Sequence, residues 1–266
     1  MTRVICMATQ KGGAGKTTSA VTLAHASARL GMRTLLVDLD PQGQCYTHLT
    51  GRVADELPKE LSAVLDGFKQ LPEVIIPRVR ENLDLCPANI KLADMELALV
   101  STLFRETRLQ KALAPVLRGY DVVFVDCPPS LGLLTSNALI AANEVVVPLA
   151  SDYFSLLGLS RLLRVVGVVK SEGNPKLRVR GIILTRYNRT IHAREVAERT
   201  REELGERIHV FEPPVNESTR FREATGLGKT IFEVAPEVQG AVAYWRIAQE
   251  IAEIAPEQLR ADVASG

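Results

Sequence analysis

Short apolar runs alternate along this chain with segments whose apolar residues recur at helical spacing. Residues 4–8 and 122–125 are continuous hydrophobic runs that predict buried strands, and residues 17–30 predict a helix directly after the first run. We expect a helix-rich stretch at 57–116 and a closing amphipathic helix near 238–254. Strands alternating with helices are typical of an α/β fold, in which helices cover both faces of a mostly parallel, twisted sheet.

Length and composition favour a single domain spanning residues 1–266. Hydrophobic residues make up 46% of the 266 positions, which suffices for one large core, and no Ser-, Gly- or Pro-rich linker interrupts the chain. The first predicted strand begins at Val4, so we expect no N-terminal helix-turn-helix domain. Arg3 precedes only a short apolar run, so we expect no signal peptide either.

The turn between the first strand and the first helix is rich in glycine. It reads Gln10-Lys11-Gly12-Gly13-Ala14-Gly15-Lys16-Thr17-Thr18. The glycines let the backbone wrap a polyphosphate with its N–H groups pointing inward, and the positive end of the next helix faces the same charge. Lys16 would reach the β- and γ-phosphates, and the Thr17 hydroxyl would hold Mg²⁺. Residues 11–18 are therefore the predicted nucleotide-binding loop.

Two later strands end in carboxylates. Asp38 and Asp40 follow the apolar run at 35–37, and Asp126 follows the run at 122–125. Because the C-terminal ends of parallel strands meet at one edge of a sheet, all three carboxylates are expected near the bound phosphates. Asp38 lies one residue deeper on the opposite face of its strand, so it is the weaker candidate and is expected to support the metal ligands.

The glycine loop departs from the ordinary phosphate-loop pattern at Gln10, where that pattern has glycine, and it carries an additional lysine at Lys11. It resembles the deviant Walker A motif of the ParA/MinD family of dimeric ATPases. The resemblance implies that Lys11 crosses a subunit interface to the partner's nucleotide phosphates. It also implies that Asp126 orders Mg²⁺ through water and that Asp40 positions the attacking water. The catalytic candidates are Lys11, Lys16 and Asp40, and the metal candidates are Thr17, Asp40 and Asp126.

The likeness to ParA covers nearly the whole chain. Residues 126–135, Asp-Cys-Pro-Pro-Ser-Leu-Gly-Leu-Leu-Thr, are similar to the family's D-x-P-P-S-L-G-x-L-T motif. Residues 144–148, 153–162, 181–190 and 220–229 continue the likeness, and these longer segments are more specific than the glycine loop. The resemblance implies a P-loop NTPase fold of the deviant Walker A class, with ATP and Mg²⁺ as cofactors.

A ParA-type protein is expected to be a partition ATPase of the cytoplasm, associated with the nucleoid. The resemblance implies a homodimer on ATP that binds nonspecific double-stranded DNA and is released when a ParB-type centromere-binding partner stimulates hydrolysis. Pro214 and Asn216 follow a later strand and are expected to flank the adenine.

Basic residues are in excess in one part of the chain. The formal net charge of +1 neither requires nor excludes a polyanionic partner, but between residues 161 and 229 fifteen Lys/Arg stand against nine Asp/Glu. Some of these charged residues, at 194–202, are spaced so that they form ion pairs along a helix surface, and they carry no function. The rest includes Arg186, Arg189, Arg220, Arg222 and Lys229, in segments resembling those with which ParA proteins grip DNA phosphates. The last four are the DNA-binding candidates, although any single arginine is equally compatible with a solvated surface.

Two other functions share the same nucleotide site. A MinD-like membrane ATPase would end in a basic amphipathic helix, and the tail after Pro256 is short and lacks a lysine-rich face, so no membrane partner is expected. A small-molecule ligase of the same superfamily would need a substrate pocket beside Asp40 and would not need Lys11.

The cysteines and histidines predict no additional metal site. Cys6, Cys45, Cys86 and Cys127 form no C-x-x-C pair, which favours reduced residues, and the histidines lack metal-ligand spacing. An iron–sulfur relative of this ATPase class would share cysteine ligands across its dimer. We nevertheless expect Cys127 to be a small packing residue in the active-site turn.

Overall fold

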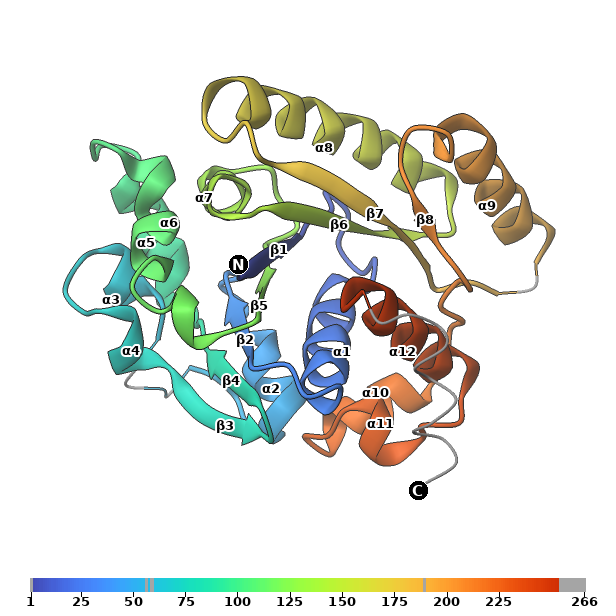
Figure 1. The fold of residues 1–266 in the computed structure, drawn as a ribbon, viewed down its shortest axis with the longest axis horizontal. Coiled ribbons are helices and arrows are strands. Elements are labelled where there is room, and N and C mark those ends of the chain that lie inside the picture. The colour runs from blue at the N-terminus through green and yellow to red at the C-terminus, as the bar shows by residue number, and fades with distance from the viewer. Residues whose placement is uncertain (1, 56, 58–59, 189, 254–266) are drawn as a thin grey trace.

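The computed structural model describes residues 2–55, 57, 60–188 and 190–253, and these form one sheet covered by helices (Figure 1). The strand order is β3-β4-β2-β5-β1-β6-β7-β8. The strands are β1 (Arg3–Met7), β2 (Thr34–Asp38), β3 (Ile76–Arg80), β4 (Leu83–Cys86), β5 (Val122–Asp126), β6 (Glu144–Ala150), β7 (Arg178–Thr185) and β8 (Val210–Phe211). All described neighbours are parallel except the β3–β4 pair, so the predicted mostly parallel α/β fold is confirmed.

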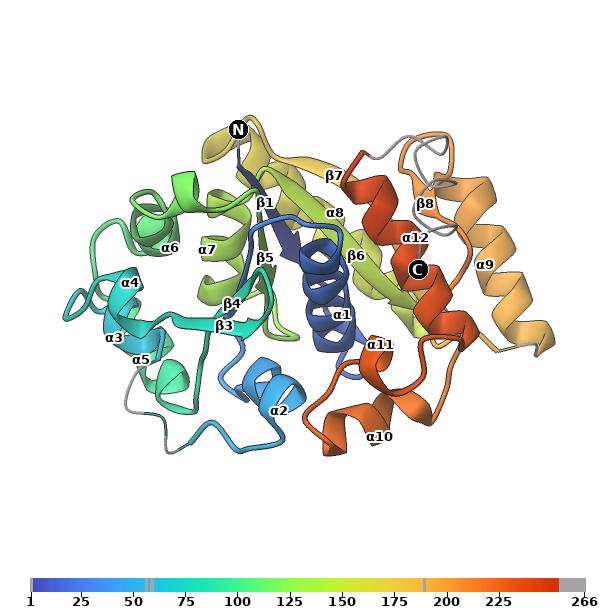
Figure 2. The same ribbon diagram turned by 60° about the horizontal axis from the view of Figure 1, so that its bottom comes forward.

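Helices connect the strands and lie on both faces of the sheet (Figure 2). The α-helices are α1 (Lys16–Arg29), α2 (Gln44–Thr50), α3 (Ser62–Leu65), α4 (Leu71–Val74), α5 (Lys91–Leu99), α6 (Arg108–Leu113), α7 (Leu133–Ala141), α8 (Tyr153–Glu172), α9 (Ile191–Leu204), α10 (Arg220–Gly226), α11 (Ile231–Val234) and α12 (Gln239–Ile251). Short 3₁₀ turns occupy η1 (Arg105–Thr107) and η2 (Leu117–Gly119).

The strand side chains alternate between two separate cores. Val4 and Cys6 of β1 belong to the core that also holds buried leucines of α7 and α8. Ile5 and Met7 belong to the other core, which contains α1 and α12. Both faces of the central strands are therefore buried, which explains why these strands are continuous apolar runs.

One part of the sequence prediction is incomplete. The stretch 57–116 was expected to be rich in helix, and it does contain α3, α4, α5 and α6, but it also contains the antiparallel pair β3–β4. The edge strand β3 has the sequence Ile-Pro-Arg-Val-Arg and none of its residues is fully buried. It lacks the apolar run by which the central strands are recognised, because only one neighbour covers it.

The carboxyl ends of three central strands meet at one edge of the sheet. Met7 of β1 is paired in register with Asp126 of β5, and Asp38 of β2 is paired with the same aspartate from the other side. The loops that follow β1, β2 and β5 therefore begin side by side, as expected for the ligand-binding edge of an open α/β sheet.

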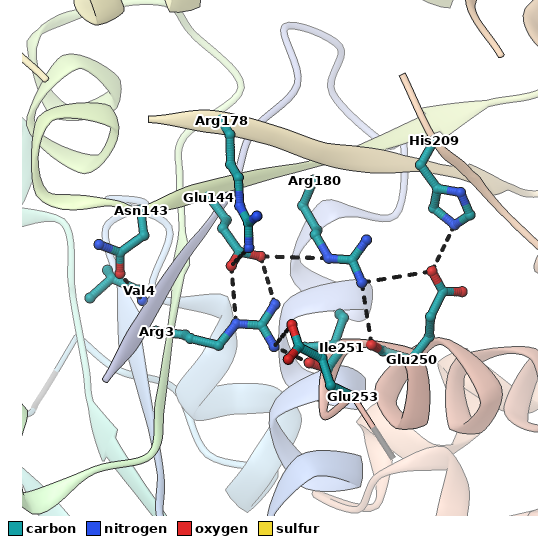
Figure 3. A network of polar contacts seen from close by, with 10 residues as sticks. All are labelled: Arg3, Val4, Asn143, Glu144, Arg178, Arg180, His209, Glu250, Ile251 and Glu253. Carbon is teal, nitrogen blue, oxygen red and sulfur yellow. Dashed lines mark hydrogen bonds and ion pairs between the residues drawn. The ribbon is translucent and has the colours of Figure 1, made fainter. Parts of the chain in front are cut away.

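A network of charged side chains lies at the amino ends of the strands, opposite the loops that carry the predicted chemistry (Figure 3). Glu144 at the start of β6 is 2% exposed and accepts hydrogen bonds from Arg3 of β1 at 2.7 Å and Arg178 of β7 at 2.9 Å. Burial alone would raise the Glu144 pKa, but these hydrogen bonds hold it below its usual value. Arg3 also donates to the Ile251 carbonyl of α12. The network joins three neighbouring strands to the last helix, far from the loops that carry the predicted chemistry.

The segment after α10 packs against the end of α2 through glycine backbones. Gly51 and Gly228 both have left-handed backbones, with φ of 69° and 63°. A Cβ on Gly228 would lie 2.4 Å from the Thr50 carbonyl carbon and from the Gly51 nitrogen. Only glycine fits here, because the site demands both a left-handed conformation and a backbone-to-backbone approach.

The Gly228→Ala variant is expected to lose about 2 to 4 kcal/mol of unfolding free energy, from left-handed strain and overpacking together. Urea unfolding followed by circular dichroism measures this loss. Gly67→Ala is the matched control, since Gly67 also has a left-handed backbone, with φ of 91°, but nothing lies within 4 Å of the added Cβ. Equal losses in the two variants would show that the close approach of α2 and α10 contributes nothing.

Candidate functional site

The glycine loop connects β1 to α1 as predicted, and two of its glycines are required by the backbone. Gly13 and Gly15 have φ of 73° and 74°, a region that residues with a Cβ rarely adopt. Gly15 is the N-cap of α1 and has no side chain, so the backbone N–H groups of the first turn remain available to a ligand. The loop and the start of a helix of 14 residues thus form an anion-binding cradle.

Lys16 lies at the centre of this cradle and is nearly buried. It is 7% exposed, and its Nζ lies 3.0 Å from Asp126 Oδ1 and 3.7 Å from Asp40 Oδ2. Burial alone would lower the Lys16 pKa, but the charge of Asp126 and its hydrogen bond raise that pKa above the usual value. Lys16 is therefore a permanent cation, placed where the sequence predicted the phosphates.

Two of the three predicted carboxylates, Asp126 and Asp40, lie against this lysine. Asp126 is fully buried and also accepts a hydrogen bond from the Thr17 hydroxyl at 2.6 Å. Asp40 is 7% exposed and accepts from the Gln42 N–H at 3.0 Å, and burial raises its pKa. The end of β5, the turn after β2 and the start of α1 after β1 each contribute a charged group to the cluster, as the parallel sheet requires.

Asp38 has a more definite role than the sequence suggested. It is fully buried and accepts from the backbone N–H groups of Asp40 at 3.0 Å and Cys45 at 2.9 Å. These bonds fix the turn that carries Asp40. Burial, reinforced by the nearby charge of Asp126, raises the pKa of Asp38 to about 8.

The site has the donor set of a hard divalent cation. Oxygen atoms of Thr17 and Asp126 lie 2.6 Å apart, and ligand atoms of Asp38, Cys45 and Asp126 lie within 4.8 Å of one another. Burial keeps the pKa of the Cys45 thiol well above its usual value, so its sulfur stays protonated and is a poor ligand. Asp40 and Asp126 both face the single cation of Lys16, which leaves an excess of negative charge that suits an ion such as Mg²⁺.

Lys11 does not join this cluster. Its Nζ pairs with the carboxylate of Asp152, which caps the N-terminus of α8, and both side chains are about one third exposed. Partial burial alone would raise the Asp152 pKa, but the hydrogen bond and the charge of Lys11 hold it below its usual value. Within a single chain, Lys11 thus lies at the entrance of the loop and is occupied by an intramolecular partner.

A cavity of about 740 Å³ extends from the loop toward the C-terminal helices. Gly13, Gly15 and Thr18 line one end of it, and Phe221 and Tyr244 line the other. Asn216 also lines the cavity, whereas Pro214, two residues earlier, is not part of its described lining. Sequence reasoning missed Tyr244, which is buried in α12 and shares a 2.7 Å hydrogen bond with Ser19 of α1. The sequence placed it only within the predicted closing helix near 238–254.

The basic candidates are spread over several environments. Arg220 begins α10, is exposed and pairs with Glu223 at 2.6 Å. Arg222 is exposed and lines the cavity, and Lys229 is exposed just after α10. Arg186 is turned toward the glycine loop, while Arg189 lies outside the described residues.

Comparisons with known proteins agree with this geometry. A family model described as an AAA domain matches residues 2–179. The sporulation initiation inhibitor protein Soj of Bacillus subtilis is 40% identical, over 95% of this chain and 99% of that protein. The chromosome-partitioning ATPase Soj of Thermus thermophilus is 41% identical, over 94% and 95%. A solved structure of a Mycobacterium smegmatis protein, named cobyrinic acid a,c-diamide synthase and holding an ATP analogue and magnesium, is 36% identical with a TM-score of 0.83 over 95% of both chains.

The Lys16→Ala variant is expected to weaken binding of a nucleoside triphosphate by roughly 10- to 100-fold, because charge-assisted hydrogen bonds to the phosphates are lost. Fluorescence titration with a labelled nucleotide measures the affinity. Lys176→Ala removes the same charge from an exposed position before β7, at the opposite edge of the sheet, and should bind normally. Wild-type affinity in Lys16→Ala would refute the assignment of the loop.

Proposed function

We propose that this chain, which belongs to the family of ParA and Soj partition ATPases, binds ATP and Mg²⁺, dimerises, holds nonspecific DNA and releases it on hydrolysis. The observation that carries the proposal is the convergence of Lys16, Asp126 and Asp40 at the mouth of the glycine loop. A cation for the phosphates, a carboxylate for the metal and a second carboxylate for water are the parts that phosphoryl transfer requires.

Different residues of the cradle would bind the phosphates and the metal ion. Backbone N–H groups of residues 12–17 and the Lys16 ammonium would hold the phosphates, while Thr17 and Asp126 would hold Mg²⁺. The metal ion supplies charge neutralisation for the oxygens of the transferred phosphoryl group. The 740 Å³ cavity beside the loop has room for the nucleoside, and Asn216, which was expected to flank the adenine, lies in its wall.

Asp40 is the group best placed to orient the attacking water. It lies 3.7 Å from Lys16 on the side of β2, whereas Asp126 is closer to Lys16 and already engaged by Thr17. Asp38 holds the turn of Asp40 by accepting a hydrogen bond from the Asp40 N–H, and the chain continues directly from the turn into α2. Movement of this turn would change water positioning and the orientation of α2 together, so a ParB-type partner that stabilises the turn would accelerate hydrolysis.

Dimerisation requires Lys11 to exchange partners. Its pair with Asp152 is one third exposed, and pairs of this kind contribute only about 0 to 1 kcal/mol. A triphosphate on a second subunit offers Lys11 a stronger and more highly charged acceptor. We infer that ATP draws Lys11 away from Asp152 and across the interface.

DNA would be held by the exposed cations of the C-terminal half. Arg220, Arg222 and Lys229 lie on or beside α10, and Arg189 belongs to the same predicted set. Contacts of this kind bind phosphates without reading bases. A groove assembled from two subunits would double the number of such contacts, which makes DNA binding depend on the ATP-bound dimer.

A small-molecule ligase is the second candidate, since the Mycobacterium smegmatis relative carries the name of an amide-forming synthase. Such an enzyme needs its acceptor substrate beside the transferred phosphoryl group. Among the described residues that line the 740 Å³ cavity, none is Asp40 or Asp126, so this cavity does not offer an acceptor pocket at the carboxylates. The partition ATPase therefore remains the better supported function.

The membrane alternative rests on the tail after Pro256, which lies outside the described residues. No helix in the described part of the chain is long and apolar enough to cross a membrane. Cosedimentation with anionic vesicles in the presence of ATP would favour a MinD-like protein over a DNA-binding one.

The Asp40→Ala variant is expected to bind ATP normally but to hydrolyse it about 100-fold more slowly, because the attacking water is no longer oriented. Its ATP complex should therefore accumulate as a dimer, measured by light scattering after gel filtration. Asp94→Ala removes an exposed carboxylate of α5 and should behave as wild type. A strictly monomeric ATP complex of Asp40→Ala would argue against the dimer.

The Arg220→Ala variant is expected to weaken ATP-dependent DNA binding without changing basal hydrolysis. Loss of one phosphate contact should reduce the slope of log affinity against log salt by about 1. Fluorescence anisotropy with a random duplex at several salt concentrations measures both quantities. Lys176→Ala, which removes a charge at the other edge of the sheet, should keep the wild-type slope, and an unchanged slope in Arg220→Ala would remove that residue from the DNA surface.

A further inference from the structure

The end of β7 reaches over the glycine loop and contacts two of its carbonyl groups. Thr185, the last residue of β7, donates from its hydroxyl to the Ala14 carbonyl at 2.8 Å and is 2% exposed. The next residue, Arg186, donates from Nη1 to the Gly13 carbonyl at 3.3 Å. Two consecutive side chains of one strand end therefore hold two consecutive carbonyls of the loop.

Peptide geometry gives these contacts a consequence for phosphate binding. In a planar trans peptide, the C=O of one residue and the N–H of the next point in opposite directions. Holding the Gly13 carbonyl toward Arg186 turns the Ala14 N–H the other way, and holding the Ala14 carbonyl toward Thr185 does the same for the Gly15 N–H. These N–H groups belong to the cradle in which the phosphates would lie.

Arg186 is itself held in a fixed position. Its Nη2 lies 3.1 Å and its Nε 3.3 Å from Glu217 Oε1, in the loop that follows β8. That loop is joined to the end of β7 by two backbone hydrogen bonds, from Tyr187 to Val215 and from Glu217 to Tyr187, at 3.0 and 2.9 Å. The guanidinium is therefore fixed between Gly13 and Glu217, and all three residues line the 740 Å³ cavity.

The backbone of Arg186 adopts a conformation that an arginine ordinarily avoids. Its φ is 50°, in the left-handed region, and glycine would adopt it without strain. Strained residues of this kind persist where the surrounding structure determines them, and they gather at ligand sites. The Arg186 side chain is more than half exposed and contacts the Gly13 carbonyl of the loop. The sequence had grouped it with the arginines in segments that resemble those gripping DNA.

We propose that Arg186 is a positioning residue of the nucleotide site: with Glu217 and Thr185 it orients the carbonyls of Gly13 and Ala14 so that the following N–H groups face the phosphates. The proposal rests on the proposed binding of ATP at this loop. It assigns Arg186 no direct contact with the nucleoside and none with DNA.

The experiment measures binding of ATP and of inorganic tripolyphosphate, each with Mg²⁺, to the full chain by calorimetry. In Arg186→Gly the affinity for both ligands should fall by the same factor, about fivefold to tenfold, which is the worth of one or two weakened hydrogen bonds. KM for ATP should rise by that factor while kcat stays within about twofold. The melting temperature without ligand should equal or exceed that of wild type, because glycine relieves the backbone strain.

Companion variants separate the contributions. Arg186→Ala removes the same guanidinium but keeps the backbone strain. It should therefore lose as much affinity for both ligands as Arg186→Gly does, and it should melt at a lower temperature than Arg186→Gly. Glu217→Gln leaves the arginine without its charged partner and should lose about twofold to threefold in affinity. Arg33→Ala is the matched control, since Arg33 forms an equally exposed ion pair with Asp121 at the far edge of the sheet and should bind both ligands as wild type does.

Three results would overturn the inference. Unchanged affinity in Arg186→Gly would show that the loop needs no such support. A loss confined to ATP, with tripolyphosphate unaffected, would make Arg186 a nucleoside contact instead. A loss of DNA binding at unchanged ATP affinity would return it to the DNA surface. Failure of the wild-type protein to bind ATP would instead refute the proposed function itself.

Discussion

The buried ion pair between Lys16 and Asp126 is the interaction on which the rest of the site depends. Neither charge can be buried alone, because removing an isolated ion from water costs several kcal/mol. Asp126 ends β5, and Lys16 begins α1 after the loop that leaves the neighbouring strand β1, so the pair depends on β1 and β5 being parallel and in the observed register. The same constraint brings Asp40 and Asp38 in from β2 on the other side of β5. The chemistry of the site is thus a consequence of strand order.

The charges of this cluster do not balance, and a charged ligand can therefore change its electrostatics. One lysine faces two carboxylates, Asp40 and Asp126, and the fully buried Asp38 beside them has its pKa raised by burial and by the charge of Asp126. A divalent cation removes that imbalance, whereas a polyphosphate alone would add to it. The geometry therefore favours simultaneous binding of metal and phosphate, with Thr17 between them. Asp38 connects this electrostatic change to the turn of Asp40, since it accepts hydrogen bonds from that turn and from the start of α2.

The sequence predicted what depends on local spacing and on strand ends. The strand-turn-helix context of the glycine loop and the convergence of three aspartates beside it follow from apolar runs and parallel topology, and both are present in the structure. The contacts of Arg186 and Tyr244 could not be foreseen, because they join segments more than 170 residues apart and look locally like a surface arginine and a core aromatic. The pair of Lys11 with Asp152 was missed for the same reason. The β3–β4 hairpin was missed because an edge strand lacks a continuous apolar run.

Backbone contacts connect the candidate site to the segment that carries the basic candidates. Helix α2 begins two residues after the turn that Asp40 opens, and it ends at Gly51, where its backbone lies against Gly228 just beyond α10. A contact without side chains leaves little room for independent movement, because close-packed backbones cannot absorb a shift by changing rotamers. In the proposed cycle, a displacement of the Asp40 turn would therefore move the segment that carries Arg220, Arg222 and Lys229. At the other edge of the sheet, the Glu144 network fixes β1, β6 and β7 to α12, so the strands themselves provide a stationary frame for that movement.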